Sequence, residues 1–136
     1  MTKPKSAEEL LDQIVARDRR YDREAYRFVS EGLAYTVQKS GRMGHVTGRE
    51  LCVGLSEYAL EQFGRLARTV LDNWGVRQSE DVGEIVFNMV DVGLLRKTDE
   101  DRRENFANVL EFRSVLDQGF ELHLKPGGAD ERSPGA

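Results

Sequence analysis

The residues with the clearest capacity for chemistry lie on a helix predicted over residues 79–92. Four polar side chains recur there at intervals of three or four residues: Asp81, Glu84, Asn88 and Asp91. This spacing places them on one exposed face, opposite an apolar stripe. Carboxylates attract cationic groups and repel phosphates, so the face predicts a protein partner rather than DNA. A face that is only solvated is the alternative.

A second charged set lies along a helix predicted from about residue 22 to residue 39. Its basic members form a candidate nucleic-acid patch: Arg20, Arg23, Arg27, Lys39 and Arg42. Tyrosines 21, 26 and 35 lie among them, and aromatic rings can stack on bases. Nearby acidic side chains can neutralise much of the patch through neighbouring pairs. An ion-paired helix surface is therefore the alternative.

The residues typical of catalytic and metal sites are few. His45, His123 and Cys52 are the only soft or imidazole ligands, and none has a partner at the spacing of a zinc site. Cys52 shares the apolar phase of its helix, which predicts a core residue. No phosphate loop or nucleophile elbow occurs. We therefore expect no catalytic residues, no metal and no cofactor.

Length and composition predict one small globular domain. The chain has 136 residues, of which 39% are hydrophobic and 32% charged, and its net charge is −4. We expect the domain to span residues 1–124 and residues 125–136 to form a disordered tail. A single cysteine and the lack of a long apolar run predict a cytoplasmic protein and no membrane contact.

Charge is unevenly distributed along the chain. Residues 17–49 hold eight Arg or Lys against four Asp or Glu, whereas residues 50–95 hold three against eight. The whole molecule is therefore not expected to be steered toward DNA, although a basic patch remains open in the first third of the chain.

Capping residues and glycines predict where the helices begin and end. Two capping boxes, Ser6 to Glu9 and Thr47 to Glu50, each precede a run with helical apolar spacing. Gly64 interrupts the second run, and we expect two helices to meet there. Gly75 and Gly93 are expected to end the two following helices.

The second half of the chain predicts a winged-helix-like arrangement. After the helix at residues 79–92 come a short predicted strand at 94–97, a charged turn and a return strand at 106–112, for which helix is the alternative. The expected fold is thus mainly α with a small β-hairpin, a helix-turn-helix plus wing, and extra N-terminal helices. The predicted core consists of Phe28, Leu33, Leu51, Leu55, Phe63, Leu66, Val70, Trp74, Ile85, Val86, Met89, Leu94 and Phe106.

Several sequence blocks keep the order and spacing of a known family. They are residues 20–26, 45–52, 63–64, 73–76, 81–88, 93–95, 97–103 and 105–109. Over about residues 8–113 the chain resembles an uncharacterised conserved hypothetical protein family found mainly in Planctomycetes and Verrucomicrobia bacteria. The resemblance implies a bacterial cytosolic protein and carries no activity, cofactor or catalytic residue.

Together these features predict a non-catalytic protein-interaction or regulatory module that binds an unknown protein partner or itself. The alternative is a nucleic-acid or ribosome-associated protein that uses the Arg-rich second helix. An enzyme whose site has no sequence signature is a further alternative.

Overall fold

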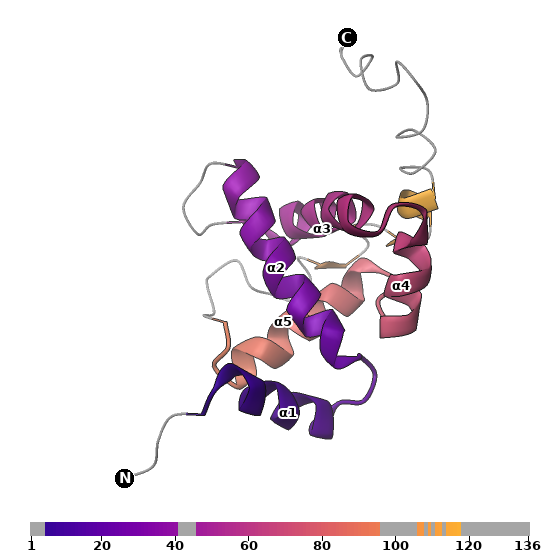
Figure 1. Ribbon diagram of the computed structural model, residues 1–136. Coiled ribbons are helices and arrows are strands. Elements are labelled where there is room, and N and C mark those ends of the chain that lie inside the picture. The colour runs from indigo at the N-terminus through magenta and orange to yellow at the C-terminus, as the bar shows by residue number, and fades with distance from the viewer. Residues whose placement is uncertain are drawn as a thin grey trace, which may run out of the picture.

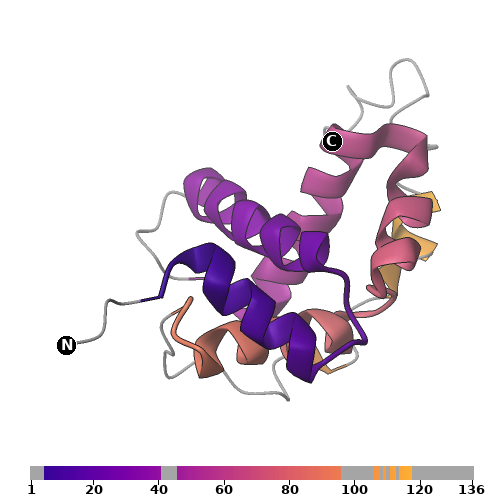
Figure 2. The ribbon, with the colours of Figure 1, turned by 60° about the horizontal axis from the view of Figure 1, so that its bottom comes forward.

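The chain is mainly α-helical in the residues that the computed structural model describes, which are 5–40, 46–95 and 106–117 except 108, 110 and 113. In chain order the helices are α1 (Ala7–Arg17), α2 (Arg23–Ser40), α3 (Gly48–Phe63), the 3-10 helix η1 (Gly64–Leu66), α4 (Ala67–Trp74) and α5 (Ser79–Asp91). Helix α2 packs against the other four α-helices and crosses in front of α5 (Figure 1). Helix α1 lies across one end of this pair (Figure 2). The prediction of a mainly helical fold is confirmed.

Both predicted capping boxes are present. The N–H of Glu9 donates to Ser6 Oγ at 3.2 Å, and the N–H of Ser6 donates to Glu9 Oε1 at 2.8 Å. Thr47 and Glu50 make the same pair of bonds at the start of α3, at 3.1 and 2.8 Å. Each box satisfies two N–H groups at its helix terminus, which fixes where α1 and α3 begin.

Glycines end the helices as the sequence predicts. Helix α3 stops at Phe63, and Gly64 starts the 3-10 turn that leads into α4, so two helices do meet there. Gly75 and Gly93 have φ values of 92° and 89°, a region that a side chain disfavours. After Gly93 the N–H of Leu94 donates to Met89 O at 2.8 Å, and this bond closes α5.

The predicted β-hairpin is not present in the described residues, which contain no β-strand and one isolated bridge between Gln78 and Glu111. Leu94 and Leu95 belong to the C-terminal cap of α5, since both N–H groups point to Met89 O. The return strand at 106–112 is wrong. The buried side chains Phe106, Phe112 and Leu116 include an i, i+4 pair, and residues 112 and 114–117 are helical. The charged turn between the two predicted strands and the predicted tail at 125–136 lie outside the described residues.

One apolar core joins all five helices. Its largest fully buried side chains include Tyr26, Phe112, Ile14, Leu55, Leu71, Ile85 and Met89. Most of the predicted core residues belong to it or pack against it. Leu66 does not: its side chain is 58% exposed, because the chain turns at Gly64 and leaves the helical phase of α3.

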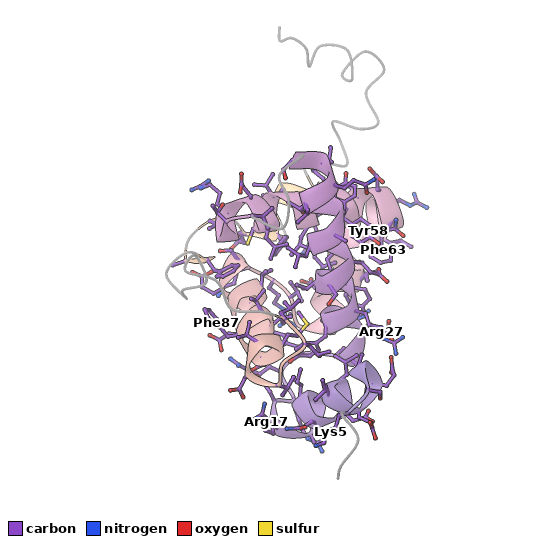
Figure 3. The ribbon with its side chains drawn as sticks, turned by 90° about the vertical axis from the view of Figure 1, so that its left-hand side faces the viewer. Lys5, Arg17, Arg27, Tyr58, Phe63 and Phe87 are labelled. Carbon is purple, nitrogen blue, oxygen red and sulfur yellow. The ribbon has the colours of Figure 1, made fainter. Side chains whose placement is uncertain are left out.

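An aromatic cluster closes the core beside α2. The ring of Phe28 lies 5.5 Å from both Tyr58 and Trp74 and 6.1 Å from Phe63, measured between centroids. Figure 3 labels Tyr58 and Phe63 at this edge of the molecule. The cluster fixes α3 and α4 against α2.

Helices α2 and α3 approach closely through glycines. A Cβ atom at Gly32 would lie 2.1 Å from Leu55 Cδ2, and one at Gly54 would lie 1.9 Å from Thr36 Oγ1. Each glycine therefore accommodates a side chain of the opposite helix. This contact sets the distance between the two helices. Thr36 and Gly54 also line a groove between α2 and α3.

Candidate functional site

Each residue of the predicted partner face on α5 is bonded within the chain. Asp91 pairs with Arg17 at 3.0 Å and Glu84 pairs with Arg20 at 3.2 Å. Arg17 projects at the α1 end of the molecule (Figure 3). The face therefore lies against the C-terminal end of α1 and the turn into α2.

A partly buried polar network forms the centre of this contact. Asn88 Nδ2 donates to Asp18 Oδ2 at 2.9 Å and to the hydroxyl of Tyr26 at 3.1 Å. Arg20 binds the same Asp18 carboxylate through its guanidinium, at 2.7 Å for the shortest contact. The hydrogen bonds of Arg20, with those of Asn88, hold the pKa of Asp18 well below its usual range, although partial burial opposes them.

Asp81 has two roles at the start of α5. Its carboxylate accepts the N–H groups of Arg77 and Gln78 at 2.9 and 3.1 Å, which caps the helix. It also accepts a hydrogen bond from the hydroxyl of Tyr21, at 2.8 Å. Burial raises the pKa of Tyr21 above its usual value, and the bond to Asp81 raises it further. Tyr21 thus fastens the α1–α2 turn to α5.

The described members of the predicted basic patch are all ion-paired. Arg23 binds Glu8 and Asp12, and Arg27 binds Glu8 at 2.8 Å. Lys39 pairs with Glu57 of α3 at 3.3 Å. Arg42 lies outside the described residues. The prediction that the tyrosines could stack on bases is wrong for Tyr21 and Tyr26, because the two side chains are only 3% and 0% exposed.

A groove of about 640 Å³ lies between the α1–α2 turn and the end of α4. Arg19, Arg20, Arg23, Arg77 and Trp74 line it, with three aspartates among them. Arg20 and Arg23 are the two patch residues that the fold brings to this groove. Its charges are mixed, so it does not form a uniformly cationic surface.

A second groove, of about 410 Å³, lies between the C-terminal half of α2 and the N-terminal half of α3. Val53 lines it and is 43% exposed. Arg49 and Glu57 flank Val53 at a spacing of four residues, so the three share one side of α3. We call Arg49, Val53 and Glu57 the α3 ridge.

The α3 ridge was not among the sites predicted from the sequence. Its signal was present, because the three residues lie out of phase with the buried stripe of Leu51, Leu55 and Ala59. The pattern spans only nine residues and is easily overlooked.

Cys52 lies in the core, as predicted, and its side chain is 0% exposed. Burial raises the pKa of its thiol to about 12, so the thiolate is scarce at neutral pH. His45 and His123 lie outside the described residues. In the part of the chain that is described, no three His, Cys, Asp or Glu residues cluster as metal ligands do.

Comparisons with known proteins found no protein family, no curated protein and no solved structure that matches this chain. Within the described residues, none of the helices combines the length and apolar character needed to traverse a lipid bilayer.

Proposed function

We propose that this chain is a non-catalytic interaction module of the bacterial cytoplasm that binds a protein partner through the α3 ridge. One observation carries the proposal: Val53 is exposed in a groove between two helices, with a cation on one side and a carboxylate on the other. Protein interfaces combine an apolar centre with a charged, solvated rim.

The α3 ridge suits a partner better than the polar face of α5. A protein that bound to α5 would have to displace Arg17, Arg20 and Tyr21 from their bonds. At the α3 ridge, Arg49 makes no hydrogen bond or ion pair with any other described residue, and its side chain is exposed. Binding there costs no internal ion pair of Arg49.

A photo-crosslinking amino acid at position 53 tests this proposal. We expect irradiation to attach a protein to residue 53, either with the purified chain alone or after addition of a lysate from the source organism. The control carries the probe at position 66, because Leu66 is more exposed than Val53 but lines none of the grooves described above. Equal labelling at both positions, or none at position 53, would contradict the proposal.

Nucleic-acid binding is the second candidate, and the groove beside Trp74 favours it. Arg19 lines this groove and has no hydrogen bond or ion pair to another described residue, so its charge is available to a phosphate. A helix-turn-helix interpretation of α4 and α5 does not add support, since the polar face of α5 contacts α1 and the α1–α2 turn.

The fluorescence of Trp74, the single tryptophan, tests this second candidate. If the groove binds single-stranded RNA, an oligonucleotide should quench the emission at low salt, and the affinity should fall steeply as salt is added. Arg19→Glu should weaken binding, whereas Arg65→Glu, at an exposed site outside the groove, should not. Unchanged emission at low salt would eliminate this candidate.

A further inference from the structure

We infer that the partner of the α3 ridge is a second copy of this chain, bound with the two α3 helices antiparallel and a two-fold axis close to Val53. The inference rests on the proposed function, because it names the occupant of the surface proposed there. It is carried by the charges on the ridge and by their symmetric placement.

The two charges are placed symmetrically about Val53. Arg49 precedes Val53 by four residues and Glu57 follows it by four, so each lies about 6 Å from Val53 along the helix axis. In an antiparallel pair centred on Val53, Arg49 of one copy faces Glu57 of the other, and the second pair repeats this contact. A parallel pair would instead place like charges together. Two-fold interfaces require such self-complementarity.

The side chains on the ridge are available for these contacts. Arg49 is exposed and has no ion pair within the described part of the chain. The Glu57 side chain is 49% exposed and binds Lys39 through Oε1. Its second oxygen can therefore accept a hydrogen bond from the guanidinium of Arg49 in the other copy. Val53 of one chain then contacts Val53 of the other chain at the two-fold axis, and this contact removes the apolar surface of both side chains from water.

The packing of α3 against α2 holds the α3 ridge in place. Behind it, Gly54 packs against Thr36, and both are buried, so α3 is held rigidly against α2. The helix can therefore present its three ridge residues without rearrangement. A preformed surface loses little conformational entropy on binding.

Cysteine crosslinking tests the position of the axis. In a Val53→Cys variant the two new thiols would meet at the two-fold axis, so mild oxidation should yield a disulfide-linked dimer. Cys52 should stay unreacted because it is buried. Leu66→Cys is the control, and we expect it to crosslink several-fold more slowly. Equal rates for the two variants would overturn the inference.

A mixture of two variants tests the direction of the helices. When Arg49→Cys and Glu57→Cys chains are mixed and oxidised, the antiparallel arrangement predicts mainly the mixed disulfide. The mixed product has its own mass and can be counted by mass spectrometry. A predominance of disulfides between like variants would overturn the antiparallel arrangement.

The tests separate this inference from the proposed function. If position 53 captures a different protein from the lysate while Val53→Cys chains crosslink no faster than the control, self-association is wrong and the α3 ridge still binds a partner. If position 53 captures nothing and Val53→Cys chains do not crosslink, both are wrong.

Discussion

Gly54→Ala is expected to lower the free energy of unfolding by about 1–3 kcal/mol, as overpacking of a well-packed contact does. The added Cβ atom would lie 1.9 Å from Thr36 Oγ1 and 2.9 Å from both Thr36 Cβ and Cγ2. Thr36 cannot simply rotate away, because it is buried and its hydroxyl donates to Gly32 O at 2.7 Å. The clash should exceed the gain of about 1 kcal/mol that alanine brings to a helix. Urea unfolding followed by Trp74 fluorescence measures the change.

A double-mutant cycle is the control for this prediction. Thr36→Gly removes all three atoms that the new Cβ would meet, at the cost of a glycine inside α2. The double variant should therefore lose less stability than the sum of the two single variants. Strictly additive losses would show that Gly54 and Thr36 do not control the spacing of α2 and α3.

Asp18→Ala is expected to lower the free energy of unfolding by about 1.5–3 kcal/mol at neutral pH, the usual range for hydrogen bonds to a charged group. The substitution leaves the guanidinium of Arg20 and the amide of Asn88 without their shared acceptor. The Asp18 side chain is only 16% exposed, so water replaces these bonds poorly. Asp91→Ala is the matched control, because the Arg17–Asp91 pair is more than half exposed on both sides and should contribute under 1 kcal/mol.

The lowered pKa of Asp18 leads us to expect a specific pH dependence of the free energy of unfolding. The pKa of Asp18 is lower in the folded chain than the 3.8 typical of aspartate, so the folded state binds its proton less readily than the unfolded state does. Its contribution is therefore complete above about pH 4 and is lost as the pH falls further. Asp18→Asn should flatten the loss of stability below this pH, measured by urea unfolding at successive pH values. An identical acid profile in both proteins would contradict the assignment.

Local sequence signals predicted the helix boundaries well. The capping boxes at Ser6 and Thr47 and the glycines at positions 64, 75 and 93 act within a few residues of themselves, so their effect is visible in the sequence. The apolar stripes of α3 and α5 depend on periodicity alone and were equally clear. The return strand failed because residues 106–112 fit both a strand and a helical spacing.

The polar face of α5 shows what periodicity cannot predict. The spacing of Asp81, Glu84 and Asn88 correctly indicated a polar side of a helix, but not what lies against it. Their partners Tyr21, Arg20 and Asp18 are at least 60 residues away in sequence. Long-range pairing of this kind depends on the assembled fold, and it also explains the unexpected burial of Tyr21 and Tyr26.

Sedimentation equilibrium of two charge-reversal variants, alone and mixed, tests the α3 ridge most directly. The wild-type mass should rise with concentration from 15.4 kDa toward twice that value. Arg49→Glu makes the ridge wholly acidic and Glu57→Arg makes it wholly basic, so each variant alone should remain monomeric. Their equimolar mixture should form a heterodimer, because every facing pair is then of opposite charge. A wild-type mass of 15.4 kDa at every concentration, or a mixture that stays monomeric, would contradict self-association through the α3 ridge.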